Sequence, residues 1–121
     1  MILYQILYAG ICILFAWFNK EWIAKDKRIK HGWNGLLHLL FAGVGFWLFD
    51  WTAIFIILCN GRVVFDMALN RFRGLEFDYV TKSPKSIIDK IERKIFGDDG
   101  ASPKIVYAFI SIGLNVIYFI P

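Results

Sequence analysis

The sequence predicts an all-α membrane protein with four transmembrane helices and one interfacial amphipathic helix. Residues 1–19, 31–49 and 105–121 carry no charged side chain. Runs of this length approach the roughly 20 apolar residues that cross a hydrocarbon core about 30 Å thick. Hydrophobic residues make up 58% of the 121-residue chain, and a soluble protein this small could not bury so much apolar surface.

The first span is predicted at residues 2–18. We expect a retained helix rather than a cleaved signal peptide, because no basic residue precedes the apolar run and bulky residues stand where a cleavage site needs small ones. A basic loop follows at residues 20–30. The second span is predicted at 33–49, and residues 50–52 are expected to form a tight turn.

The third span, predicted at residues 53–70, is apolar in its first half only. Its second half carries Arg62, Asp66 and Asn70. Charged groups inside a membrane are costly and normally have partners. This span is therefore the first place to look for a site.

A polar segment, residues 71–103, follows and contains one predicted helix at 84–96. Ser83 can cap this helix, Pro84 suits its first position and Gly97 suits its end. Its predicted apolar face consists of Ile87, Ile88, Ile91, Ile95 and Phe96. Lysines, an arginine and acids occupy the other faces, so the helix is too polar to span. It should lie on the membrane surface or against a partner.

The last span is predicted at residues 104–120, after a Ser-Pro start signal at 102–103. The chain then forms a single membrane domain. Of its 14 Lys and Arg residues, five lie in residues 20–30 and nine in residues 62–104. Four spans put both basic segments on one side, which the positive-inside rule makes the cytoplasm. A three-span alternative, with 33–70 as one bent helix, would separate the two segments. Both termini are therefore predicted on the non-cytoplasmic side.

Polar residues spaced four apart mark one stripe on each of three predicted spans. If these stripes face inward they would form one intramembrane network. Its predicted members are Arg62, Asp66, Asn70, His38, Asn34, Ser111 and Asn115. The main interpretation is structural: hydrogen bonds that hold the helices together. The alternatives are a proton or ion relay and a partner-facing patch.

Catalytic and cofactor motifs are not evident in the sequence. There is no zinc-ligand motif, and His31 and His38 are seven residues apart, too far to share one ion directly. Cys12 and Cys59 lie in apolar runs and are expected to be buried hydrophobes. We expect no metal, no cofactor, no enzyme activity and no nucleic-acid partner, since the net charge of +4 is explained by basic loops beside anionic lipid.

The stretch from Arg62 to Asn70 reads R-x-x-F-D-x-x-x-N and is followed by Tyr79, then Ser86 and Asp89. It resembles small integral membrane proteins of Bacteroidetes and their bacteriophages. The resemblance covers about residues 33–92 and transfers no catalytic residue. It implies that Arg62, Phe65, Asp66 and Asn70 form a shared core, and that the setting is a bacterial inner membrane or a phage internal membrane.

These observations favour a structural or accessory subunit of a membrane assembly, including a phage virion membrane component. Its expected partners are the lipid bilayer and other membrane subunits or further copies of the chain. One alternative is a holin-like pore-former. Another is a small transporter or membrane enzyme that uses Asp66 and His38.

Overall fold

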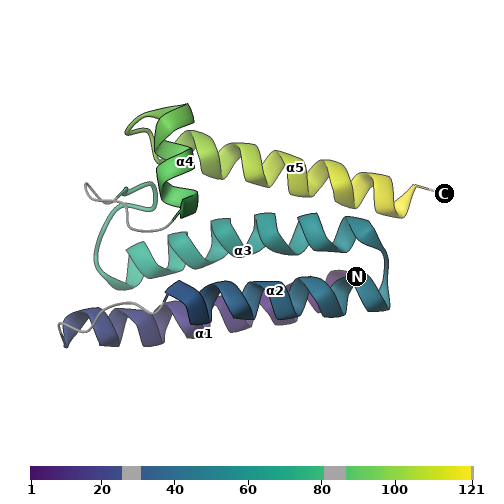
Figure 1. Ribbon diagram of the computed structural model, residues 1–121, viewed down its shortest axis with the longest axis horizontal. Coiled ribbons are helices and arrows are strands. Elements are labelled where there is room, and N and C mark those ends of the chain that lie inside the picture. Colours follow the sequence, from purple (N-terminus) through teal and green to yellow (C-terminus); the bar gives the residue numbers. More distant parts are fainter. Residues whose placement is uncertain (26–30, 81–86, 121) are drawn as a thin grey trace.

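The computed structural model describes residues 1–25, 31–80 and 87–120, and all regular structure in these ranges is helical. The helices are α1 (Ile2–Ala24), α2 (His31–Leu48), α3 (Trp51–Phe72), α4 (Ile87–Phe96) and α5 (Ala101–Phe119). Four of them run alternately in opposite directions along one axis, while α4 lies across the beginning of α5 (Figure 1). The all-α prediction is confirmed for the described residues.

Three helices are long and apolar enough to cross a membrane: α1, α3 and α5, with 23, 22 and 19 residues. The helix α2 has an apolar stretch at Trp33–Leu48 that is shorter than the other three. These lengths are compatible with a membrane location.

The boundaries of the helices extend beyond the apolar runs in several places. The helix α1 continues to Ala24 rather than ending at residue 18, and α3 covers Trp51–Phe72 rather than 53–70. Charged residues such as Lys20 and Glu21 are compatible with helical backbone, so a change in polarity does not end a helix. The predicted start of α4 at residues 83–84 lies outside the described residues.

An aspartate lies at the start of each of two helices that begin earlier in the chain than predicted. The predicted turn at residues 50–52 is instead the beginning of α3, because Asp50 caps it and accepts a hydrogen bond from the Thr52 amide at 2.7 Å. Ser102 was expected to start the last helix at 104. In the structure α5 begins at Ala101 with Gly100 as its N-cap. Asp99, just before this cap, accepts from Ser102 Oγ at 2.5 Å and from the Ser102 and Ala101 amides at 3.2 and 2.9 Å. These bonds, the Ser102 hydroxyl first, lower the pKa of Asp99.

The helix α3 is central, since it packs against α1, α2 and α5. Buried Tyr8 and Cys12 of α1 meet Ala42 of α2 and Ile57 of α3 in one hydrophobic cluster. Tyr8 and Cys12 are four residues apart and share one face of α1. The core is therefore a narrow seam along α3.

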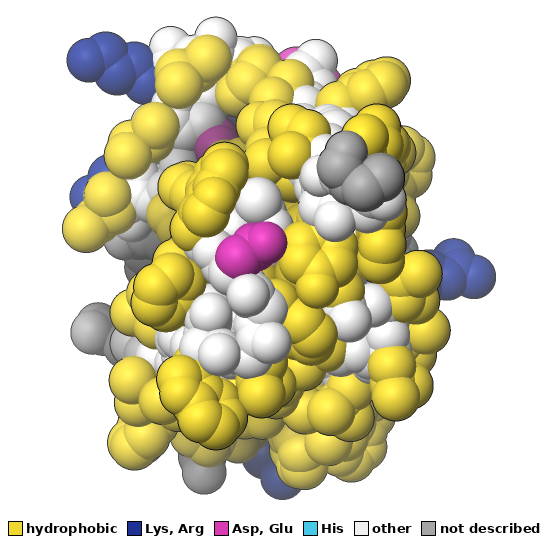
Figure 2. Space-filling view, turned by 90° about the vertical axis from the view of Figure 1, so that its right-hand side faces the viewer, with side chains coloured by type: hydrophobic (Ala, Val, Ile, Leu, Met, Phe, Trp, Pro, Cys, Tyr) yellow, Lys and Arg dark blue, Asp and Glu magenta, His cyan; other side chains and the backbone are white. Residues whose placement is uncertain are grey.

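The outside of the bundle is strongly apolar. Large hydrophobic side chains are exposed on all four long helices, and Trp47 reaches 82% exposure. Figure 2 views the end that carries both termini, where hydrophobic side chains dominate and the visible Lys and Arg side chains lie at the margins. Apolar surface this extensive is normally covered by lipid or by another protein.

Candidate functional site

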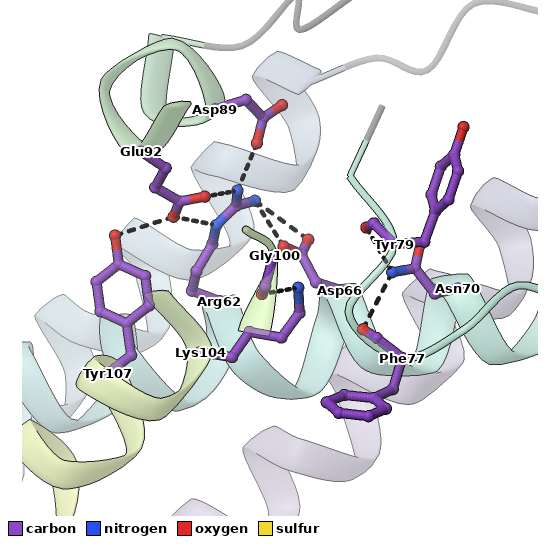
Figure 3. A network of polar contacts seen from close by, with 10 residues as sticks. All are labelled: Arg62, Asp66, Asn70, Phe77, Tyr79, Asp89, Glu92, Gly100, Lys104 and Tyr107. Atoms are coloured by element: carbon purple, nitrogen blue, oxygen red, sulfur yellow. Dashed lines mark hydrogen bonds and ion pairs between the residues drawn. The ribbon is translucent and has the colours of Figure 1, made fainter. Parts of the chain in front are cut away.

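The side chain of Arg62 lies at the centre of a charged cluster between α3 and α4 (Figure 3). Its guanidinium donates two hydrogen bonds to Glu92, from Nε to Oε1 at 2.8 Å and from Nη2 to Oε2 at 2.6 Å. Nη1 lies 3.0 Å from Oδ2 of Asp66, one turn along α3, and Nη2 also pairs with Asp89. The flat fork of arginine suits such bidentate contacts. One cation thus joins three carboxylates from two helices.

Two residues of α5 complete this Arg62 cluster. The Tyr107 hydroxyl donates to Oε1 of Glu92 at 2.9 Å. Lys104 is buried, donates from Nζ to the Gly100 carbonyl at 3.0 Å and lies near enough to Asp66 to attract it electrostatically. With every group ionised, the three carboxylates exceed the two cations by one charge. The removal of either cation would leave negative charge with too little compensation.

The Arg62 cluster determines which side of α4 faces the bundle. Asp89 and Glu92, three residues apart, share a helix face, and their side chains are only 20% and 14% exposed. Phe96 was predicted to lie on the apolar face, yet it is half-buried. The other four predicted members are exposed: Ile87 75%, Ile88 53%, Ile91 53% and Ile95 67%. The acidic side of α4 is therefore docked, and its isoleucine side is open.

A chain of amide and hydroxyl groups links α1, α3 and α5 closer to the middle of the bundle. The Gln5 amide donates to Asn115 at 2.6 Å and accepts from Asn60 at 3.0 Å. Asn60 in turn accepts from the Ser111 hydroxyl at 2.7 Å. In an apolar environment each such bond removes an unsatisfied polar group, so the chain favours one arrangement of the three helices.

The imidazole of His38 in α2 contacts Tyr8 of α1, with 2.5 Å between Nδ1 and the hydroxyl oxygen. Its ring also meets Phe65 edge-on, at a centroid separation of 6.0 Å. The pair fits only because residue 61 is glycine. A Cβ on Gly61 would overlap the Tyr8 hydroxyl and lie 3.0 Å from Nδ1 of His38. Gly61 therefore lets α1 and α2 approach the backbone of α3.

Asn19 of α1 and Asn34 of α2 exchange two side-chain hydrogen bonds, both at 3.2 Å. An open pocket of about 410 Å³ adjoins this pair. The pocket is lined by Phe15, Phe18, Asn19, Trp22, Trp33 and Asn34. Its lining is mainly aromatic, with the amide pair as its polar part.

Asn70, near the end of α3, secures the segment that follows this helix. Its side-chain amide donates to the backbone carbonyls of Phe77 and Tyr79 at 3.2 and 3.0 Å (Figure 3). The backbone carbonyl of Asn70 accepts from the Leu75 amide at 2.9 Å. This role within the chain is structural.

The seven residues of the predicted network fall into five groups instead of one. The groups are Arg62 with Asp66, Ser111 with Asn115, His38 with Tyr8, Asn34 with Asn19, and Asn70 with the loop. Three of the groups meet α3 at the consecutive residues Asn60, Gly61 and Arg62, which point in different directions from the helix axis. Among the described residues no hydrogen bond or ion pair joins one group to another. The partners that sequence analysis missed are Gln5, Tyr8, Asn19, Asn60, Asp89, Glu92, Lys104 and Tyr107. A single polar residue in an uncharged run, such as Gln5, is the signal that could have revealed some of them.

The described residues contain no group of three or more His, Cys, Asp or Glu side chains arranged to hold a metal ion. In the Arg62 cluster, the position between the carboxylates is taken by a guanidinium.

Comparisons of this chain with protein-family models, with curated proteins and with solved structures give no match. A functional conclusion therefore has to come from the residues and contacts described above.

Proposed function

We propose that this chain is a four-span membrane protein that serves as a structural or accessory subunit of a membrane assembly. The main support is that its polar groups are engaged with one another. Among the described residues, every buried side-chain nitrogen or oxygen has a hydrogen-bond partner. Polar side chains used in this way hold helices together, while the apolar exterior is available to lipid and neighbouring subunits.

The fourth span in this proposal is α2. Its 18 residues rise about 27 Å at ~1.5 Å per residue, close to the ~30 Å of a hydrocarbon core. The antiparallel course of α2 beside α3 supports this assignment (Figure 1). So does the exposure of the five tryptophans, which fall near the two ends of the helices as interfacial residues do.

The proposed orientation places the α1–α2 and α3–α5 connections in the cytoplasm and both termini outside. The described parts of these two connections, residues 20–25, 71–80 and 87–100, lie at the end of the bundle opposite the termini (Figure 1). The resemblance around Arg62–Asn70 makes a bacterial inner membrane or a phage internal membrane the setting in which to look for the assembly.

The topology is tested with single cysteines in a chain whose Cys12 and Cys59 are replaced by alanine. Lys20→Cys, Arg73→Cys and Ile120→Cys are treated in intact cells with a membrane-impermeant thiol reagent. Only the cysteine at 120 should be labelled, and all three should react after lysis. Different labelling of the cysteines at 20 and 73 in intact cells would overturn the four-span topology, because a three-span topology would place these two positions on opposite sides of the membrane.

The subunit role is tested on the native assembly, with Arg62→Gln, Asp66→Asn and the double variant. Solubilised source membranes are resolved by native electrophoresis and mass spectrometry. A structural pair predicts that each single change reduces assembly and that the double change restores part of it. A lone monomer carrying only lipid in the wild type would overturn the accessory role. Intact assembly with loss of a transport or enzymatic activity would favour the transporter or enzyme alternative.

The contacts of Asp66 and His38 favour the structural role over a relay between them. Asp66 interacts with Arg62 and Lys104, whereas His38 interacts with Tyr8 and Phe65. No hydrogen bond among the described residues joins the two sets of partners, although Arg62 lies near enough to His38 to act on it electrostatically. A relay would require a continuous hydrogen-bonded path between the two residues.

A further inference from the structure

The helix α4 carries three distinct faces. At 3.6 residues per turn, Asp89, Glu92 and Phe96 point towards one side, which is the docked face. The isoleucine face consists of Ile87, Ile88, Ile91 and Ile95. The basic face consists of Lys90, Arg93 and Lys94. The isoleucine and basic faces flank the docked face on its two sides, about a third of a turn away.

The position of α4 gives these two flanking faces opposite surroundings. The helix lies across the direction of the bundle (Figure 1), so in the proposed topology its axis runs along the membrane plane. The ion pairs to Arg62 hold the docked face sideways against α3. One flanking face must then point towards the bilayer and the other towards the cytoplasm. The exposed isoleucines suit the acyl region, and the lysines suit the headgroup region.

We propose that α4 binds the headgroups of anionic phospholipids through Lys90 and Lys94 while its isoleucines insert between the acyl chains. This inference rests on the proposed topology. Both lysines are exposed, whereas Arg93 already donates to Asp98, at 2.9 Å from Nε. Charge decides between lipid and a partner helix as the occupant. A partner covering the isoleucines would leave the adjacent basic face unexplained, while an anionic bilayer satisfies both faces.

The experiment is hydrogen–deuterium exchange of the full chain in nanodiscs. The backbone amides of α4 are compared in phosphatidylcholine alone and in phosphatidylcholine with a third of phosphatidylglycerol. Anionic lipid should slow exchange in α4 by up to about fivefold for each lysine that it contacts. Lys90→Gln/Lys94→Gln should lose most of this effect. The control Lys20→Gln/Lys25→Gln removes the same charge from the last turn of α1 and its C-cap and should keep the effect.

Equal exchange of α4 in the two lipids would overturn the proposal, as would an effect that survives Lys90→Gln/Lys94→Gln. Loss of the effect in the α1 control as well would assign it to general surface charge and also overturn the proposal. The topology is judged separately by the cysteine labelling described above. If that labelling stands and the lipid effect is absent, the four-span protein remains and only the lipid site is rejected.

Discussion

Replacement of Arg62 by glutamine should release α4 from the bundle. The change keeps a polar side chain but removes the charge that joins three carboxylates. Removal of one partner from a buried ion pair costs about 3–5 kcal/mol. The Arg62 side chain is 21% exposed, so solvent screening reduces this to about 2–3 kcal/mol. The ten residues of α4 are too few to form a stable helix alone, so lost docking should become local unfolding.

This prediction is checked by hydrogen–deuterium exchange of α4 in an uncharged detergent, where lipid charge cannot contribute. A loss of about 2–3 kcal/mol corresponds to exchange roughly 30 to 150 times faster. The double variant Arg62→Gln/Glu92→Gln returns the cluster to its original net charge and should recover part of the protection. The matched control is Arg93→Gln, because Arg93 pairs with Asp98, whose side chain is 81% exposed. It should change exchange by only a few fold, as expected for a surface pair.

The reasoning would be refuted if Arg62→Gln left exchange in α4 within about twofold of the wild type, or if the Arg93→Gln control accelerated it equally. The first result would mean that contacts other than the charge of Arg62 hold the helix. The second would mean that any loss of positive charge destabilises α4.

Two further predictions concern one close helix contact and one aspartate that accepts hydrogen bonds at the start of a helix. Gly61→Ala should destabilise the bundle by about 1–3 kcal/mol, because the new methyl group must displace Tyr8, and this should lower the melting temperature. The control Gly113→Ala should not lower it, since nothing lies within 4 Å of the new Cβ. Equal melting temperatures of the two variants would contradict this prediction. Asp99→Asn should destabilise α5 above about pH 4. The folded-state pKa of Asp99 is lowered, so its charge stabilises above the unfolded pKa and that advantage disappears as pH falls through the folded pKa. A difference in stability between the wild type and Asp99→Asn that does not change with pH would contradict this second prediction.

Local patterns in the sequence predicted which segments are helical. Uncharged apolar runs indicated four of the helices, and the spacing of the isoleucines indicated α4. The ends were less accurate because they depend on capping. Asp50 and Asp99 satisfy free amides at the starts of α3 and α5. Aspartates also occur elsewhere in the polar loops, so the sequence alone does not identify the ones that bind the first amides of a helix.

The candidate site was predictable only within single helices. The spacing of Arg62 and Asp66 indicated an ion pair, and that pair is present. Glu92 is 30 residues from Arg62 and Asn115 is 110 residues from Gln5. Such pairings require the height and rotation of each neighbouring helix, which periodicity does not contain.

The sequence by itself determined that the chain forms apolar helices with a basic end, because charge and hydropathy are properties of each segment. It also indicated the isoleucine face of α4, since helical periodicity is local. Only the tertiary structure decided that the acidic face of α4 docks on Arg62, that Phe96 turns inward, and that the predicted network divides into five groups. These outcomes depend on side-chain volumes at close contacts such as Gly61, which set how far one helix slides past another.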